Sequence, residues 1–241
     1  MAGDRTGKLW ACIAAAHEGD GPASVAALCR AAVFCLGVDG ASVIATSGLV
    51  AREPLFASDE LSAQLEELQF TTGEGPAAQD LEFGAPLLVP DLESVTARWP
   101  IFAPAAVIAG VRALFAVPLQ AGAIQVGVLS TYRARPGPLA VTQLADALVL
   151  ADIALQMVLD AAAGISGSPD YRPLEGLSDR RAEVYQAVGM ISVQLEVDLE
   201  EAFVRLRAHA FGSGAALGDA ADDVVNHRLR LEPDRESGPG R

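Results

Sequence analysis

The segments VRALFAVPL, residues 111–119, and AIQVGVLSTYR, residues 123–133, decide the fold class of this chain. Both are short, rich in β-branched or aromatic residues and flanked by glycine, which is typical of strands. Residues 38–46 and 49–57 show the same composition on either side of Ser47 and Gly48, a link of the hairpin type. A further short strand is expected at 87–89. The first part of the chain therefore contains several strands in addition to helices.

The segments before, between and after these strands have apolar residues at the spacing of helices. We expect two helices within residues 8–37 and an amphipathic helix over 58–70 with Ser58 ahead of its first turn. Residues 139–163 predict one long helix, whose apolar positions suit a partner helix and make it the expected element of a homodimer. These positions alternate in spacings of four and three: Leu144, Leu148, Ala151, Leu155 and Val158.

Composition excludes several classes of protein. The 241 residues carry 17 basic and 31 acidic side chains, a net charge of −14, so a nucleic-acid site would have to be local. No apolar run approaches the roughly 18 residues that span a bilayer, and no secretory signal is visible, so we expect a cytoplasmic protein without a membrane partner. The three cysteines lack CxxC spacing, which argues against a disulfide framework or a zinc site.

A glycine- and proline-rich stretch, residues 164–176, is interpreted as a linker between two domains. Three short helices are expected after it, at about 178–195, 199–211 and 216–229, within a domain over 177–231. Asp198 and Glu201 form a capping-box pattern for the middle helix, and Gly212 is the expected residue after its end. Residues 232–241 are expected to be disordered.

The sequence offers little support for an enzyme. The three histidines are far apart in the sequence and lack metal-ligand spacing, and no serine or cysteine sits in a nucleophile elbow, so neither a catalytic residue nor a metal site is predicted. The loop GEGPAAQD, residues 73–80, lacks the lysine of a phosphate-binding loop. Gly73 and Gly75 are expected to supply unusual backbone angles, with a lid over a pocket as the alternative.

Residues 8–162 resemble a GAF domain, a sensory fold. The resemblance rests on TTGEGPAAQDLEFGAPLLVPDL, RWPIFAPAA, GVRALFAVPLQ, GVLSTYRARPG and the closing helix. It implies an α+β fold with a central antiparallel sheet flanked by helices, an unidentified small-molecule ligand between sheet and loops, and dimerisation through the terminal helices. By analogy the pocket would include residues for which core packing is the alternative: Phe70, Glu74, Trp99, Phe102 and Phe115. Ala77 stands where relatives often have a cysteine, so sensing through a thiol is not expected there.

Three later blocks resemble an ANTAR domain, the three-helix RNA-binding module of bacterial transcription antitermination regulators. They are YQAVGM at 185–190, EAFVRLRAHA at 201–210 and LGDAADDVV at 217–225. The resemblance implies a dimer that binds RNA hairpins of nascent transcripts through their loops. Val188 occupies a position that is often lysine in that family.

The RNA-binding residues are predicted from their position and chemistry. Residues 174–231 contain six arginines and ten acidic residues, so RNA recognition must depend on geometry rather than on net charge. The candidates are polar residues beside the apolar stripes or near a helix start: Arg180, Arg181, Tyr185, Gln186, Arg205, Arg207 and His209. A plain solvated face is the alternative. The competing function is a GAF-mediated small-molecule-binding or protein-interaction module whose C-terminal helices only dimerise.

Overall fold

The computed structural model describes residues 2–17, 23–47, 51–78, 84–163 and 177–232. The chain divides into two compact units, residues 1–175 and residues 176–241, and each is described by itself. The expected turn at Gly48, the linker over 164–176 and all but the first residue of the expected tail lie outside the described residues.

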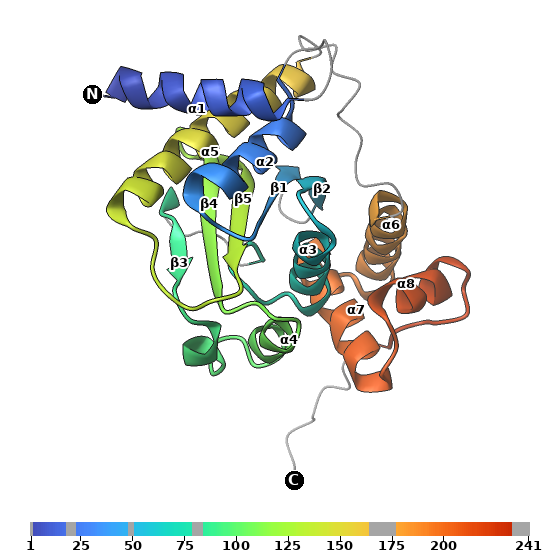
Figure 1. The fold of residues 1–241 in the computed structure, drawn as a ribbon. Helices are drawn as coiled ribbons and strands as arrows, with labels where there is room; N and C mark the ends of the chain where they lie inside the picture. Colours follow the sequence, from blue (N-terminus) through green and yellow to red (C-terminus); the bar gives the residue numbers. More distant parts are fainter. Residues whose placement is uncertain (1, 18–22, 48–50, 79–83, 164–176, 233–241) are drawn as a thin grey trace. The chain divides into compact units, whose positions relative to one another are not determined.

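The first unit is built on a five-stranded antiparallel sheet with strand order β2-β1-β5-β4-β3 (Figure 1). Its strands are β1 (Gly40–Ser47), β2 (Ala51–Ala57), β3 (Leu87–Val89), β4 (Ala113–Ala121) and β5 (Ile124–Arg133). The two opening segments of sequence form β4 and β5 at the middle of the sheet, paired along their whole length. The expected α+β class with a central antiparallel sheet is confirmed.

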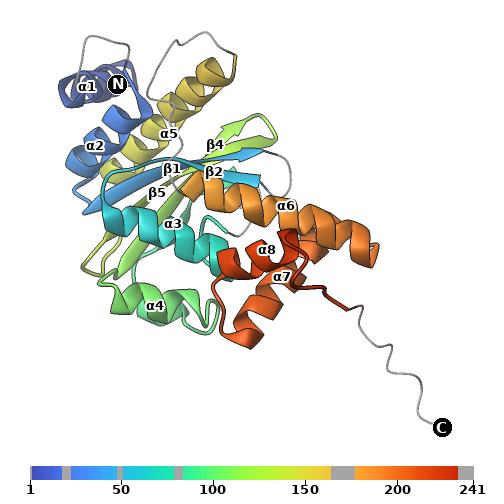
Figure 2. The ribbon, with the colours of Figure 1, turned by 90° about the vertical axis from the view of Figure 1, so that its right-hand side faces the viewer.

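Helices cover both faces of this sheet (Figure 2). On one face lie α1 (Ala2–Ala16), α2 (Val25–Leu36) and α5 (Val141–Ala162), and on the other α3 (Glu60–Thr72) and α4 (Phe102–Ile108). Successive strand residues point to opposite faces. Val117 and Leu119 therefore pack in the core beneath α2 and α5, whereas Leu114 packs with α3 and α4.

Two helix starts differ from the sequence prediction. Helix α1 begins at Ala2 rather than near residue 8, because ion pairs hold the first two turns, which Gly3 and Gly7 weaken. The Lys8 ammonium lies 2.7 Å from Asp4, and Arg5 lies 2.9 Å from Asp146 on α5. At α3 the N-cap is Asp59, whose carboxylate accepts the Ser62 N–H at 2.8 Å.

The apolar stripe of α5 serves the core of its own unit. Ala151, Leu155 and Val158 are buried in the cluster that α5 forms with α1, α2 and the sheet, while Leu148 is 42 % exposed. The partner helices that the spacing predicts are therefore present in the same chain. A homodimer through 139–163 stays a prediction, and its surface would have to use exposed positions such as Val141 and Leu148.

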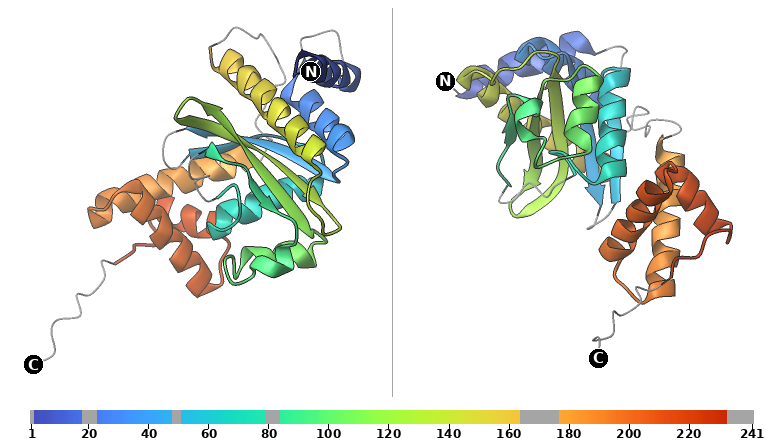
Figure 3. Two further views of the ribbon diagram at one scale, coloured as in Figure 1. Left: turned by 90° about the vertical axis from the view of Figure 1, so that its left-hand side faces the viewer. Right: turned by 90° about the horizontal axis from the view of Figure 1, so that it is seen from below.

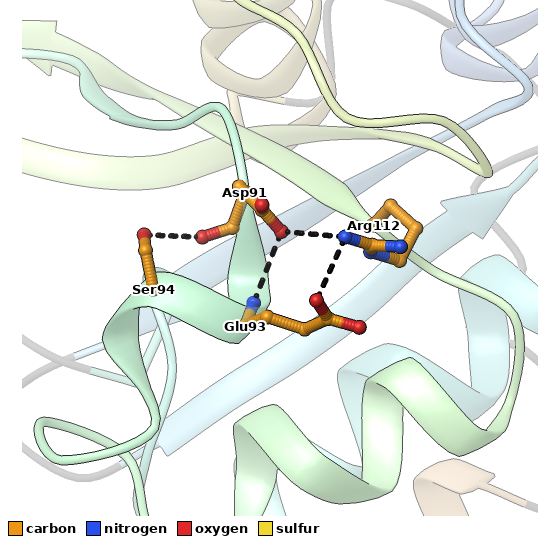
Figure 4. A network of polar contacts seen from close by, with 4 residues as sticks. All are labelled: Asp91, Glu93, Ser94 and Arg112. Carbon is orange, nitrogen blue, oxygen red and sulfur yellow. Dashed lines mark hydrogen bonds and ion pairs between the residues drawn. The ribbon is translucent and has the colours of Figure 1, made fainter.

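A polar network fixes the chain after β3 (Figure 4). Asp91 caps the short 3-10 helix η2 (Leu92–Val95) by accepting the Glu93 N–H at 3.2 Å. Arg112, just before β4, lies 3.1 Å from Asp91 and 3.0 Å from Glu93. One guanidinium thus joins the turn after β3 to the start of the neighbouring strand.

The second unit is a bundle of three helices, seen together in Figure 3: α6 (Leu177–Leu195), α7 (Leu199–Ser213) and α8 (Leu217–Val225). Its buried side chains follow the helical spacing expected from the sequence: Val184, Val188, Ile191, Phe203, Leu206, Ala210, Leu217, Ala221 and Val224. Asp198 is the N-cap of α7 as expected and accepts the Glu201 N–H at 2.8 Å. The expected role of Gly212 is wrong: it lies within α7, and Gly214 ends the helix at φ 69°.

Candidate functional site

A stripe of polar residues on α3 faces the interior of the first unit. Ser62, Glu66 and Gln69 recur at spacings of four and three, and each is no more than 3 % exposed. An amphipathic helix over these residues would bury its leucines, yet of Leu61, Leu65 and Leu68 only Leu65 is fully buried. A buried carboxylate requires hydrogen-bonding partners, so this stripe defines a polar site beneath the helix.

The sheet supplies those partners. The Ser42 hydroxyl on β1 donates to Glu66 Oε1 at 2.7 Å, and the Gln69 amide nitrogen lies 3.4 Å from Glu66 Oε2. Gln69 Oε1 in turn accepts the Ala77 N–H at 2.8 Å. Glu66 is thereby connected through Gln69 to the glycine-rich loop after α3.

A small cavity lies beside this carboxylate, with room for about one water molecule. Glu66, Ser42, Ser130 and Thr131 line it. The Ser130 hydroxyl is buried and has no hydrogen-bond partner among the described residues. A polar cavity with an unused hydroxyl and a buried carboxylate can accept a small polar group.

A second polar cluster closes one end of the site. The Asp59 carboxylate accepts hydrogen bonds from the hydroxyls of Ser58 at 2.7 Å, Ser62 at 2.9 Å and Tyr132 at 3.2 Å. Burial acts to raise the pKa of Asp59, but these hydrogen bonds outweigh it and the pKa lies below its ordinary value. Burial, together with the charge of Asp59, raises the pKa of Tyr132 to about 12. A Cβ on Gly40 would lie 2.2 Å from Asp59, so this position of β1 requires glycine.

Glu74, one of the expected ligand residues, caps a helix. Its Oε2 accepts the N–H groups of Ile101 and Phe102 at 2.8 Å each, at the start of α4. Gly73 and Gly75, on either side of it, have φ of 69° and 104°, which confirms the expected unusual backbone. Gly73 ends α3, so the loop begins where that helix stops.

The expected aromatic ligand residues are dispersed through the core. Trp99 and Phe102 are buried and meet edge to face, with ring centroids 5.9 Å apart. Phe70 is 4 % exposed on α3. Phe115 shares its face of β4 with Val117 and Leu119, opposite the face that carries Ser130, and Arg133 covers its ring. The structure does not bring the five expected residues to one cavity, and their ligand role stays a prediction.

Sequence reasoning missed the buried polar residues of α3 and of the sheet that form this site. Ser62, Glu66 and Gln69 have the composition of a solvent-facing stripe, which an isolated helix would present outward. Ser42 and Ser130 stand among apolar strand residues on the same face of the sheet, and polar residues at such positions were the available signal.

In the second unit the expected RNA-binding residues differ widely in exposure. Arg180 and Gln186 are exposed, whereas Arg181 is 1 % exposed and offers no side chain to a ligand in this structure. Tyr185 and His209 are half-buried. Arg181 was expected on the surface, but it lies one turn before Val184 on the apolar stripe of α6.

The two arginines of α7 contact residues of their own helix. Arg205 Nε lies 2.7 Å from the Glu201 carboxylate, and the Arg207 guanidinium lies 3.7 Å from the centre of the Phe203 ring. Val188 is 2 % exposed, so it contributes to the core of the bundle rather than to a binding surface. Because position 188 is buried, having valine there instead of lysine does not change the charge of the exposed face of the bundle.

A groove of about 720 Å³ lies between α6 and the segment that follows α8. Gln186 and Gly189 of α6 line it, together with His227, Leu229 and Arg230, which follow α8. His227 and Arg230 could not be assigned to this groove from the sequence, because only the return of the chain after α8 places them beside α6.

Among the described residues no group of histidine, cysteine and carboxylate side chains is arranged to hold a metal ion. No helix in the described part of the chain is both long and apolar enough to cross a membrane.

Comparison with solved structures places the first unit in a known fold. The GAF domain from a phosphoenolpyruvate-protein phosphotransferase of Coxiella burnetii matches 67 % of this chain and 94 % of its own, with a TM-score of 0.50 and 13 % sequence identity. The GAF domain of the Acinetobacter phosphoenolpyruvate-protein phosphotransferase covers 69 % of this chain and 96 % of its own, with a TM-score of 0.47 and 11 % identity. The GAF-B domain of DevS from Mycobacterium smegmatis covers 58 % of this chain and 93 % of its own, with a TM-score of 0.42 and 16 % identity. No family model and no curated protein matches the sequence. At this level of identity the comparison with the Coxiella domain shows the fold alone, which is that of a GAF domain.

Proposed function

We propose that this chain is a ligand-responsive regulator of transcription antitermination. A small molecule bound by the first unit changes how the three-helix unit binds hairpin loops of a nascent transcript, and bound RNA is held in a fold that competes with the terminator. The ligand shifts the equilibrium between two conformations of the protein, and it does so only through its different affinity for each of them. No catalytic step is required, and the protein works in the cytoplasm as a homodimer.

The observation that carries the proposal is the order of the two units. A GAF fold precedes three helices, and the sequence blocks that resemble an ANTAR domain coincide with α6, α7 and α8. The exposed side chains of Arg180 and Gln186 give this unit a guanidinium and an amide for RNA. The polar cavity at Glu66 has room for about one water molecule, so a larger ligand of the first unit would bind there only if the cavity widens.

The decisive experiment measures binding of the full chain to a two-hairpin RNA that overlaps a terminator, by fluorescence anisotropy at fixed salt. We expect the wild type to prefer this RNA over one with scrambled loops, and Arg180→Ala and Arg207→Ala to weaken binding by about three- to tenfold each. Arg135→Ala is the matched control, because Arg135 is an exposed arginine of the first unit. Equal, salt-suppressed binding to both RNAs would remove the antitermination proposal.

The competing function has a specific observation in its favour. Arg205, Arg207 and Arg228 contact neighbouring side chains of the second unit, so these three guanidinium groups already have protein partners and are less available to RNA. Sedimentation of the chain with residues 177–241 deleted separates the two functions. Loss of the dimer in a chain whose full-length form binds no RNA supports the competing function.

A further inference from the structure

The groove beside α6 has a size and a lining suited to a small planar group. Its volume of about 720 Å³ lies in the range of ligand pockets, which is about 300–1,000 Å³. Met190 and Val193 form part of an apolar floor, and Val193, in the last turn of α6, is 81 % exposed. A flat ligand lying on this apolar floor would remove the largest area of it from water, and binding would be favoured in proportion to that area.

Gly189 keeps the floor open. A Cβ at this position would meet nothing within 4 Å, so the backbone of α6 is accessible from the groove. Glycine inside a helix weakens the helix relative to alanine, and packing of the bundle does not require it here. Contacts within the described bundle therefore do not explain this glycine, which leaves the helix backbone open to the groove.

The opposite wall is formed by a chain segment that is held in place. His227 has φ 58° and turns the chain after α8, and the N–H groups of Arg228 and Leu229 both donate to the Asp223 carbonyl, at 2.8 and 2.9 Å. The Arg228 guanidinium also contacts the carboxylates of Asp222 and Asp223. The Gln194 amide donates to the Leu231 carbonyl and ties the segment back to α6. The wall is therefore present before any ligand arrives.

The polar groups of the groove match a nucleobase beside a phosphate. Gln186 offers an amide that can both donate and accept, and His227 and Arg230 lie on the opposite wall. Among the described residues no carboxylate lines the groove, although acids outnumber arginines in the sequence of this unit. The groove is thus locally suited to an anionic ligand on an otherwise acidic surface.

We propose that this groove binds one unstacked base of an RNA loop, with the base lying on the floor at Gly189, Met190 and Val193 and with Arg230 facing its phosphate. This inference rests on the proposed function, because it names the part of the RNA that the second unit recognises. Single-stranded loop bases are commonly held at one face and by hydrogen bonds at an edge; in this groove the face would meet apolar side chains and backbone instead of an aromatic ring.

The test is a double-mutant cycle between the protein and the RNA. Each loop nucleotide of the two-hairpin RNA is replaced in turn by an abasic nucleotide, and affinity is measured for the wild type and for Gly189→Leu, which fills the groove. We expect one loop position at which the abasic change weakens wild-type binding about tenfold, and we expect Gly189→Leu to lose that dependence. Arg230→Gln should reduce affinity about threefold and lower the salt dependence of binding.

Gly212→Leu is the matched control, because Gly212 is also a helical glycine with nothing within 4 Å of an added Cβ and does not line the groove. Circular dichroism confirms that both variants are folded. Additive effects at every loop position overturn the groove as a base site while leaving specific RNA binding intact. Absence of any loop preference in the wild type instead removes the proposed function. A change in sedimentation of Gly189→Leu with unchanged RNA affinity overturns the inference and assigns the groove to a second copy of the chain.

Discussion

Ser42 on β1 and Ser130 on β5 are direct partners in the antiparallel register, and both are buried on the same face of the sheet. Only Ser42 has a described hydrogen-bond partner, the Glu66 carboxylate at 2.7 Å. Two serine side chains at paired positions therefore differ in their contribution to the stability of the fold.

This difference predicts opposite effects of the same substitution. Ser42→Ala leaves a buried carboxylate with one fewer donor and should lower the free energy of unfolding by about 1–3 kcal/mol. Ser130→Ala removes a buried hydroxyl without a described partner and should leave stability unchanged or raise it by up to about 1 kcal/mol. Urea unfolding of the two variants measures this. A larger loss of unfolding free energy for Ser130→Ala than for Ser42→Ala would contradict the described hydrogen bonding of the two serines.

Glu74 caps the start of α4 through two backbone N–H groups. Glu74→Ala removes the acceptor of two backbone N–H groups and should cost about 1–2 kcal/mol, as for other helix caps, whereas Glu74→Gln should retain part of the cap. Thermal unfolding of the two variants provides the comparison. If Glu74→Ala is as stable as the wild type, the cap contributes nothing in solution.

The Asp59–Tyr132 pair should make stability depend on pH at both extremes. The folded pKa of Tyr132 is raised to about 12, so its contribution is complete below the unfolded tyrosine pKa of about 10 and is lost as pH rises from there through about 12. The folded pKa of Asp59 is lowered, so its contribution is present above about pH 4, the unfolded value, and is lost as pH falls.

Unfolding free energies across pH measure both effects. Tyr132→Phe should abolish the alkaline loss, at a cost of about 1 kcal/mol near neutral pH from the missing hydrogen bond. Asp59→Asn should reduce the acid loss. An alkaline profile for Tyr132→Phe that matches the wild type would assign the loss to other groups.

Two glycines of the second unit should respond oppositely to alanine. Gly189 lies inside α6 with open space around it, so Gly189→Ala should raise stability by about 0.5–1 kcal/mol. Gly214 has φ 69°, so Gly214→Ala should lower stability by about 1 kcal/mol. Thermal unfolding reports the two shifts, and a fall in melting temperature for Gly189→Ala would show that α6 packs more closely there than described.

Much of the architecture could be predicted from local patterns. The strands at 111–119 and 123–133, the long helix over 139–163 and the N-cap at Asp198 all follow from composition and spacing, which act over a few residues. The start of α1 was missed because it depends on an ion pair between Arg5 and Asp146, which are distant in the sequence. The same limit applies to Glu66, whose hydrogen bond comes from a different element.

The sequence by itself determined the order of strands and helices and the apolar stripes of α6, α7 and α8, because periodicity and turn chemistry are local. Only the tertiary structure decided which side of α3 is inside, since Ser62, Glu66 and Gln69 are buried where the sheet supplies partners for their polar groups. It also decided that Arg181 is buried, and that His227 and Arg230 stand opposite Gly189. Such relationships arise from packing between residues far apart in the chain, which no local pattern encodes.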